Sequence, residues 1–182
     1  FASPLKAYTK PMTTIYFLIA DIQKRSFSPK LLLKNVLRGK AISYLKKSLL
    51  VKHLPVGGIK VIQQHCFILY KLGFQAQLVY MGSYRGDFFD IKTDSIHIEE
   101  LGFSLRTTDI VVCPEFCPQL GLQFLNARRV LFFQNLRSIG DHLQKDNIEN
   151  YHKLGYDFVF CCGSLIQNRL RRFCNDPIKI QN

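Results

Sequence analysis

Short apolar runs alternate with helix-type segments along this chain, and the alternation constrains its fold more than any other feature of the sequence. The runs are rich in β-branched and aromatic residues, which is typical of strands that are buried on both faces of a parallel sheet. The core strands predicted in this way are residues 15–20, 78–80, 110–112, 130–133 and 158–160, and residues 94–101 are interpreted as a further short strand. Strands that alternate with helices predict an α/β domain of the Rossmann-like kind, in which helices cover both faces of a mostly parallel sheet.

The helix with the clearest pattern is predicted over residues 59–72. Its apolar residues recur at helical spacing, and Gly73 follows at the position where a left-handed residue commonly ends a helix. Those apolar residues are Ile59, Ile62, Cys66, Leu69 and Leu72. Shorter helices are predicted within residues 117–127, 146–155 and 164–174.

Length and composition favour a single domain. The 182 residues are 47% hydrophobic, which is enough to bury a core, and no apolar run approaches the roughly 20 residues that cross a bilayer. Residues 13–182 are therefore interpreted as one domain, and residues 1–12 as an extension or the edge of a fragment. The six cysteines lie mostly in apolar stretches, so they are interpreted as reduced core thiols of a cytoplasmic protein. Cys113 and Cys117 lack a second pair at matching spacing, and no metal site is predicted.

Most of the positive charge lies in the first third of the chain. Residues 1–60 hold 12 Lys and Arg against one acid, a net charge of +11, whereas the remaining 13 bases and 12 acids give +1. Residues 28–53 are interpreted as a basic, amphipathic helical insertion, which is either a solvated face lying over the core or a surface for anionic lipid or a polyanion. The only aromatic residue within it is Tyr44, which disfavours stacking on nucleic-acid bases. The bases assigned to a membrane-facing surface are Lys30, Lys34, Arg38, Lys46 and Lys47.

The residues that directly follow each predicted strand are candidates for a binding cleft, because ligands bind outside the carboxyl ends of the strands in an open parallel sheet. Gly57 and Gly58 precede the long helix, where they permit a phosphate or sugar to approach free backbone N–H groups closely. They match neither the GxGxxG spacing nor the P-loop spacing, so a simple turn stays an alternative. The full set of candidate cleft residues is Gly57, Gly58, Lys60, Glu115, Gln134, Asn135, Gly163 and Ser164.

The other candidate residues also have ordinary structural interpretations. Glu115 is alternatively a solvated loop acid, Gln134 and Asn135 form a turn, and Ser164 is the N-cap of the last helix. The five histidines are interpreted as packed or surface residues, His142 among the latter, because none lies at a predicted strand end. The catalytic base is therefore not assigned.

Several segments resemble the N-terminal domain of GT-B type glycosyltransferases. The resemblance rests on "GGIKV" at the start of the long helix, on "LGF" at its end and on the following "QAQLVY". It continues through "DIVVCPE", "RRVLFFQN" and "YDFVFCCGSLIQNRLRRF", and the final "NDPIKIQN" resembles the run that leads into the second domain of that family. The resemblance covers residues 13–182. The chain departs from the pattern in the long basic stretch before the glycines, and a second, donor-binding domain is absent from it.

The resemblance implies transfer of a sugar from a nucleotide-sugar donor to a glycan, lipid-linked or protein acceptor, with no metal or other cofactor. In such enzymes the second domain holds most of the donor and the N-terminal domain recognises the acceptor, so this chain alone is expected to be inactive. By the same resemblance, Gly57 and Gly58 would line the cleft near the donor phosphates, and Glu115, Gln134 and Asn135 would lie on the acceptor side. The protein is expected to be cytoplasmic and peripheral on the inner face of the membrane.

A non-catalytic interpretation stays open beside this one. The charge distribution also suits a Rossmann-like binding module whose basic N-terminal third docks on nucleic acid or on an anionic surface. Nucleic acid is the less favoured of these two partners, because the basic stretch carries so few aromatic residues.

Overall fold

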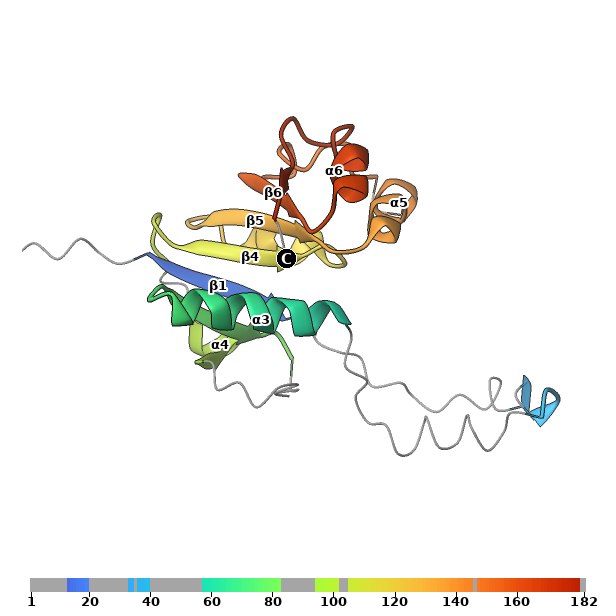
Figure 1. The fold of residues 1–182 in the computed structure, drawn as a ribbon, viewed down its shortest axis with the longest axis horizontal. Coiled ribbons are helices and arrows are strands. Elements are labelled where there is room, and N and C mark those ends of the chain that lie inside the picture. The colour runs from blue at the N-terminus through green and yellow to red at the C-terminus, as the bar shows by residue number, and fades with distance from the viewer. Residues whose placement is uncertain are drawn as a thin grey trace, which may run out of the picture.

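The computed structural model describes residues 13–19, 33–34, 36–39, 57–82, 94–101, 105–145 and 147–180. These residues form an α/β domain around one seven-stranded sheet, in which every pair of neighbouring strands is parallel (Figure 1). The Rossmann-like class predicted from the alternation is confirmed. The strands are β1 (Thr14–Ile19), β2 (Gln75–Tyr80), β3 (Ser95–His97), β4 (Ile110–Pro114), β5 (Arg128–Phe133), β6 (Phe158–Cys161) and β7 (Ile178–Lys179).

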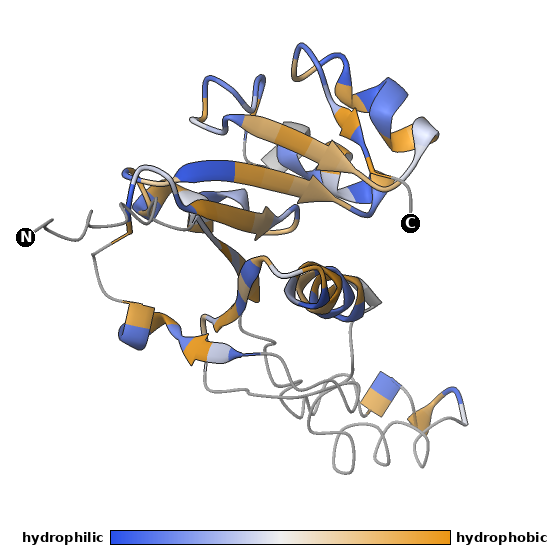
Figure 2. Cartoon of the chain, turned by 60° about the vertical axis from the view of Figure 1, so that its left-hand side comes forward, coloured by the Kyte–Doolittle hydropathy of each residue, from blue (hydrophilic) through white to orange (hydrophobic). Residues whose placement is uncertain are grey.

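The strand order across the sheet is β3-β2-β1-β4-β5-β6-β7. The chain therefore builds from β1 toward one edge and then, starting at β4, toward the other. All five predicted core strands are confirmed, and Figure 2 shows hydrophobic residues running along them. Continuous apolar runs suit this sheet, because successive side chains point to opposite faces and both faces are covered. In β5, Val130 and Phe132 face one core layer, Leu131 and Phe133 face the other, and each is 3% exposed or less.

Helices lie on both faces of the sheet, as predicted. One face is covered by α3 (Gly57–Lys71), which buries Ile59, Ile62 and Cys66 in the core layer that it shares with β1 and β2. The opposite core layer receives Leu101, Ile139, Ile166 and Leu170 from helices on the other face. Those helices are α4 (Ile98–Leu101), α5 (Leu136–Lys145) and α6 (Ser164–Leu170), and the 3-10 helix η1 (Pro118–Gln123) lies beside β4. Each fully buried Ile or Leu side chain contributes about 1.5–3 kcal/mol to folding, so the apolar face of each helix fixes it on the sheet.

The end of the long helix is as the sequence predicts, but the helix begins at Gly57, so the glycine pair lies in its first turn and not in front of it. Helix α3 ends at Lys71, and Gly73 takes a left-handed φ of +87°. The N–H of Phe74 then donates a hydrogen bond of 3.0 Å to the carbonyl oxygen of Leu69. This bond satisfies one of the carbonyl groups that the last helical turn leaves without an intrahelical partner.

The helix predicted in residues 146–155 is wrong. Residues 147–150 have no regular structure and residues 151–155 form a turn; Asn147 has a φ of 51° and Gly155 a φ of 105°. Ile148 and Tyr151 are buried, so the apolar spacing that suggested a helix belongs to a non-helical segment whose side chains reach into the core. The helix lies earlier, at α5. Its His142, which the sequence analysis placed on the surface, is buried at 3% exposure, 3.1 Å from the Tyr151 hydroxyl through Nδ1.

Three other predicted elements are confirmed with different bounds. Residues 94–101 hold the short strand β3, but α4 follows it directly. The helix predicted in residues 117–127 is the 3-10 helix η1. The last helix, α6, ends at Leu170 because the chain turns there and buries Phe173 and Cys174 against the core.

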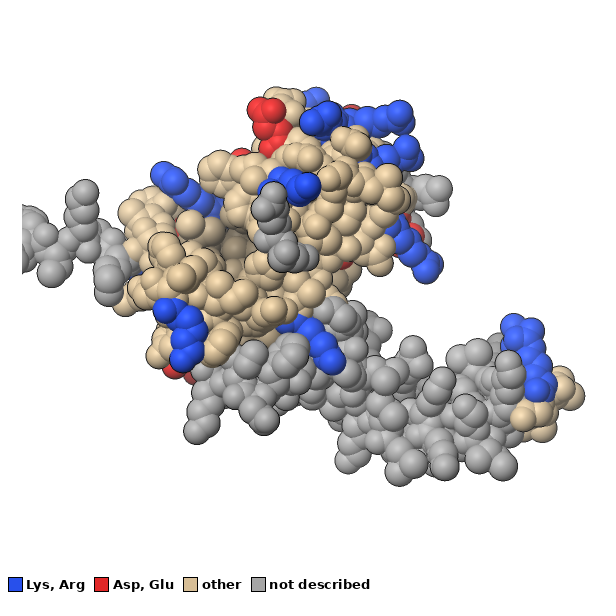
Figure 3. Space-filling model, viewed as in Figure 1, with Lys and Arg blue, Asp and Glu red and all other residues tan. Residues whose placement is uncertain are grey.

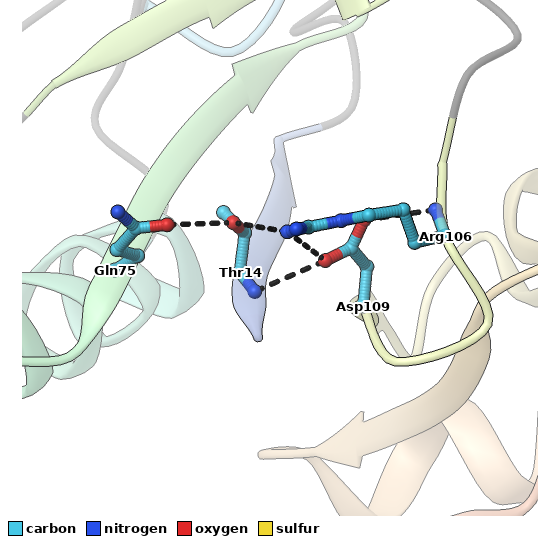
Figure 4. A network of polar contacts seen from close by, with 4 residues as sticks. All are labelled: Thr14, Gln75, Arg106 and Asp109. Carbon is cyan, nitrogen blue, oxygen red and sulfur yellow. Dashed lines mark hydrogen bonds and ion pairs between the residues drawn. The ribbon is translucent and has the colours of Figure 1, made fainter. Parts of the chain in front are cut away.

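The amino-terminal edge of the sheet is held by a network of polar contacts (Figure 4). The Asp109 carboxylate accepts hydrogen bonds from the Thr14 N–H at 3.1 Å and from the Arg106 Nη2 at 2.9 Å. The Thr14 hydroxyl donates in turn to Gln75 Oε1 at 3.1 Å. Burial would raise the pKa of Asp109, but the hydrogen bonds from Arg106 and Thr14 outweigh it and hold the pKa below its ordinary value. The network joins β1, β2 and the turn before β4 at the edge opposite the strand carboxyl ends.

Only part of the basic insertion falls within the described residues. Lys34 and Arg38 are exposed there, while Lys30, Lys46 and Lys47 lie outside the described residues. The neighbouring apolar side chains are exposed as well, by 51–81%; they are Leu33, Val36 and Leu37. Among the described residues, no helix is both long and apolar enough to cross a bilayer.

Candidate functional site

The point where the strand order reverses lies between β1 and β4. In open α/β sheets the loops diverge at this point and leave a crevice at the carboxyl ends of the strands, where ligands bind. Glu115 directly follows β4, and Gln134 and Asn135 follow β5. Helix α3, the next described element after β1 apart from residues 33–39, begins at Gly57. The structure brings four of these predicted residues together, Gly58, Glu115, Gln134 and Asn135, and they are called the switch-point cluster below.

Gly58 and Gln134 are in direct contact across 76 positions of sequence. The Gln134 Nε2 donates a hydrogen bond of 3.2 Å to the Gly58 carbonyl oxygen. A Cβ built at Gly58 would lie 3.1 Å from Gln134 Oε1, which is closer than most such contacts. Gly58 does not have a left-handed φ, so a glycine is favoured here by the lack of space beside the helix start. The close approach that the glycine permits is made by a side chain of the protein itself.

Glu115 is a buried acid and not the solvated loop acid of the alternative interpretation. The residue is only 6% exposed, and its N–H donates to the carbonyl oxygen of Phe132 at 3.2 Å. Burial raises the pKa of the Glu115 carboxyl to about 7, although hydrogen bonds from its own N–H and from the N–H groups of Gln134 and Asn135 oppose the rise. The carboxyl therefore anchors the turn after β5 and exchanges its proton near neutral pH.

Asn135 connects this cluster to the next helix. Its Oδ1 accepts a hydrogen bond of 2.9 Å from the N–H of Arg137, in the first turn of α5. That bond satisfies one of the N–H groups that a helix start leaves unpaired. The Gln134 carbonyl oxygen accepts a weak bond from Cys162 Sγ at 3.7 Å, which ties the end of β6 to the same turn.

The remaining predicted residues are not members of the switch-point cluster, although Gly57 directly precedes Gly58. Gly163, and not Ser164, is the N-cap of α6, and its φ of −162° is ordinary extended backbone. The Ser164 hydroxyl accepts a hydrogen bond of 3.1 Å from Lys179 Nζ, which ties α6 to β7. Lys60 is half-buried in the first turn of α3. His65, further along α3, packs the edge of its ring on Phe132, with centroids 5.3 Å apart.

Buried thiols surround the sheet but are poor nucleophiles. Burial raises the pKa of Cys66, Cys113 and Cys117 to about 12. A thiol with such a pKa is almost entirely protonated at neutral pH, and the thiolate is the reactive form. Within the described part of the chain, no three His, Cys, Asp or Glu side chains are grouped to hold a metal ion. The titratable group of the switch-point cluster is therefore the Glu115 carboxyl.

The structure also shows a feature that sequence analysis missed. A groove of about 900 Å³ lies between α5 and α6 and includes Asn135, so it adjoins the switch-point cluster. Its basic residues are Arg137, Arg169 and Arg172. Arg169, in α6, and Arg172, in the turn after it, are three residues apart, and this helical spacing is visible in the sequence. The groove itself was missed because α5 forms its second wall and α5 was not predicted.

Comparison of the chain with protein-family models, with curated proteins and with solved structures returns no match. The conclusions about the site therefore rest on its own geometry. That geometry consists of a buried acid with a pKa of about 7, a glycine at the start of a long helix, and a glutamine whose N–H contacts the acid and whose side chain contacts the glycine, at the carboxyl edge of a parallel sheet.

Proposed function

We propose that this chain is the acceptor-side Rossmann-like domain of a GT-B type glycosyltransferase. The observation that carries the proposal is the switch-point cluster, in which residues from three separate segments meet where an open parallel sheet binds its ligands. The motifs that resemble the family contain all four of its members. Gly58 comes from "GGIKV", Glu115 from "DIVVCPE", and Gln134 and Asn135 from "RRVLFFQN".

Glu115 supplies the chemistry that such a domain needs. Transfer of a sugar to an acceptor hydroxyl requires a base that takes the hydroxyl proton. A carboxyl with a pKa of about 7 is suited to that task near neutral pH, and an ordinary surface acid is a weaker base. We therefore assign to Glu115 the role of accepting this proton, and to Gln134 and Asn135 the role of holding the carboxyl in place through their N–H groups.

A second candidate function is a non-catalytic module that docks on an anionic surface. The observation that favours it is the exposure of Lys34 and Arg38 next to exposed Leu33 and Leu37, which is the residue mixture of an interfacial helix. The two functions are compatible, because a lipid-linked acceptor would require the enzyme to lie at a membrane.

The test of the proposal is sugar transfer by the full-length protein that contains this chain. Release of nucleotide is measured with UDP-, GDP- and ADP-sugars, in the presence of a chelator, against glycan and polyprenyl-linked acceptors. Glu115→Gln should lower turnover by about a hundredfold or more, as loss of a general base does, without lowering the thermal midpoint. The matched control is Glu149→Gln, which changes an exposed acid outside the switch-point cluster.

Two results would overturn the proposal. One is the absence of transfer from every nucleotide sugar by the full-length protein. The other is transfer at the wild-type rate by Glu115→Gln, which would remove the residue from the chemistry.

A further inference from the structure

The groove between α5 and α6 has apolar residues at both of its walls. Leu136, at the start of α5, is 39% exposed, and Leu165, in the first turn of α6, is 71% exposed. Both side chains line the groove, and the helices that carry them are packed against each other. An exposed leucine on its own is ordinary, but two that face one concave surface form an apolar contact area.

Arginines surround these leucines, and Figure 3 shows basic side chains gathered over α5 and α6 at the upper right of the molecule. Arg137 forms an ion pair with Asp141, at 3.8 Å, on the α5 wall. Arg169 and Arg172, on the α6 wall, make no side-chain hydrogen bond or ion pair with any residue that the structure describes. Among the described residues, the groove therefore carries two guanidinium groups without an acidic partner, next to exposed apolar surface.

We propose that the α5–α6 groove binds an acidic amphipathic helix of a protein partner. A third helix packs naturally into the groove between two helices, with apolar residues at positions i, i+3, i+4 and i+7 toward Leu136 and Leu165. Carboxylates on the flanks of that helix would pair with Arg169 and Arg172, since the planar guanidinium binds a carboxylate through two parallel hydrogen bonds. The inference does not depend on the proposed function.

The charge and shape of the groove favour a protein helix over a lipid surface. Membrane-binding patches are protruding clusters of about four to eight Lys and Arg. Here the basic residues are three arginines in a groove with one exposed leucine on each wall, and one arginine is already paired. Arginine is the basic residue enriched in protein interfaces. The groove adjoins Asn135, whose N–H holds the Glu115 carboxyl, so a helix bound there would lie beside the switch-point cluster.

The experiment is a selection followed by binding measurements on the full chain. A displayed library of helix-forming peptides of about 18 residues, or five helical turns, varies Glu, Asp, Leu, Phe and Ser at its surface positions. Peptides that bind the wild-type protein at about 0.15 M salt, where long-range surface charge is screened, are measured by fluorescence anisotropy. The expected binders carry leucine or phenylalanine on one face and acids on its flanks. The all-D form of a selected peptide, which has the same charge and hydropathy, should not bind.

Matched variants locate the binding site. Arg169→Glu with Arg172→Glu should weaken binding by about tenfold or more, as loss of charge pairs at an interface does. Arg128→Glu with Lys153→Glu, which reverses two exposed charges elsewhere, should leave binding unchanged. Leu165→Ser should also weaken binding, whereas Leu125→Ser, at a residue that is 74% exposed outside the groove, should not.

Three results would overturn the proposal. The first is a library selection in which no peptide binds the wild-type protein above background. The second is equal loss of binding in the groove variants and their controls. The third is binding of phosphatidylserine vesicles, but of no peptide, that is lost on Arg169→Glu with Arg172→Glu, which would assign the groove to lipid.

Discussion

The Gln134 side chain donates a hydrogen bond of 3.2 Å to the carbonyl oxygen of Gly58 and so joins the end of β5 to the first turn of α3. The two elements belong to different parts of the sequence and are brought together only by the order of the strands. Because the contact lies at the carboxyl edge of the sheet, a change in either residue affects the shape of the switch-point cluster.

Gly58→Val should lower the free energy of unfolding by about 1–2 kcal/mol, because an added side chain meets Gln134 at 3.1 Å and overpacking costs this much. The cost should fall to about 0.5 kcal/mol or less when Gln134→Ala removes the obstructing amide, as coupling between residues in contact requires. Urea unfolding of the wild type, the two single variants and the double variant measures the coupling. An equal cost of Gly58→Val in both backgrounds would mean that Gln134 does not limit the space at this helix start.

Glu115 should make the protein less stable as the pH rises. Its pKa is about 7 in the folded protein against an ordinary 4.5, so the folded state holds the proton more tightly. Its contribution is therefore complete below about pH 4.5 and is lost as the pH rises to about 7, a loss on the order of 3 kcal/mol. Glu115→Gln should remove this loss, so the variant should be more stable than the wild type at pH 8 and similar to it near pH 4.

The measurement is chemical unfolding of the wild type and Glu115→Gln at pH values from 4 to 8. The difference between the two proteins isolates Glu115, because other groups such as Asp109 contribute equally to both. Glu149→Gln serves as the control, since it changes an exposed acid outside the switch-point cluster. A flat difference for Glu115→Gln would show that its carboxyl titrates as an ordinary one.

Alanine should have opposite effects at two glycines. Gly155 has a φ of +105°, and an added Cβ would lie 3.0 Å from the Arg129 guanidinium nitrogens, so Gly155→Ala should destabilise by roughly 1–3 kcal/mol. Gly140 lies within α5 with open space where its Cβ would stand, so Gly140→Ala should stabilise by about 0.5–1 kcal/mol. Thermal unfolding of the two variants beside the wild type checks both signs. A stabilising Gly155→Ala would contradict the strain assigned to the turn before β6.

Anionic membranes should bind the chain through the basic insertion. Each basic side chain near a charged leaflet contributes about 1 kcal/mol, so Lys34→Glu with Arg38→Glu should weaken partitioning more than tenfold. Flotation with phosphatidylserine vesicles at low and high salt measures the effect, and Arg128→Glu with Lys153→Glu is the charge-matched control. Absence of wild-type binding at low salt would remove the membrane interpretation.

Local sequence determined the strands and the long helix. The runs of residues 15–20 and 130–133 are apolar at consecutive positions, and such runs are stable only where both faces of a strand are covered, which a parallel sheet with helices on both faces provides. Helix α3 was predictable because three features indicate the same helix: its apolar spacing, the glycines at its start and Gly73 after its end. The candidate cleft residues followed from the rule that ligands bind at the carboxyl ends of parallel strands.

Tertiary structure decided which of these residues meet and what their environment is. The order of the strands places the turn after β5 next to the end of β4, so that Glu115 lies against the N–H groups of Gln134 and Asn135 and becomes a buried acid with a raised pKa. Local sequence carries no signal for that burial, because the desolvation of a carboxyl depends on residues that are distant along the chain. Residues 147–155 show the same dependence, since Ile148 and Tyr151 have helical spacing but enter the core from a segment that is not a helix. Spacing along the sequence shows which apolar side chains could share one face of an element. Packing between elements decides whether a helix or an irregular segment places those side chains in the core.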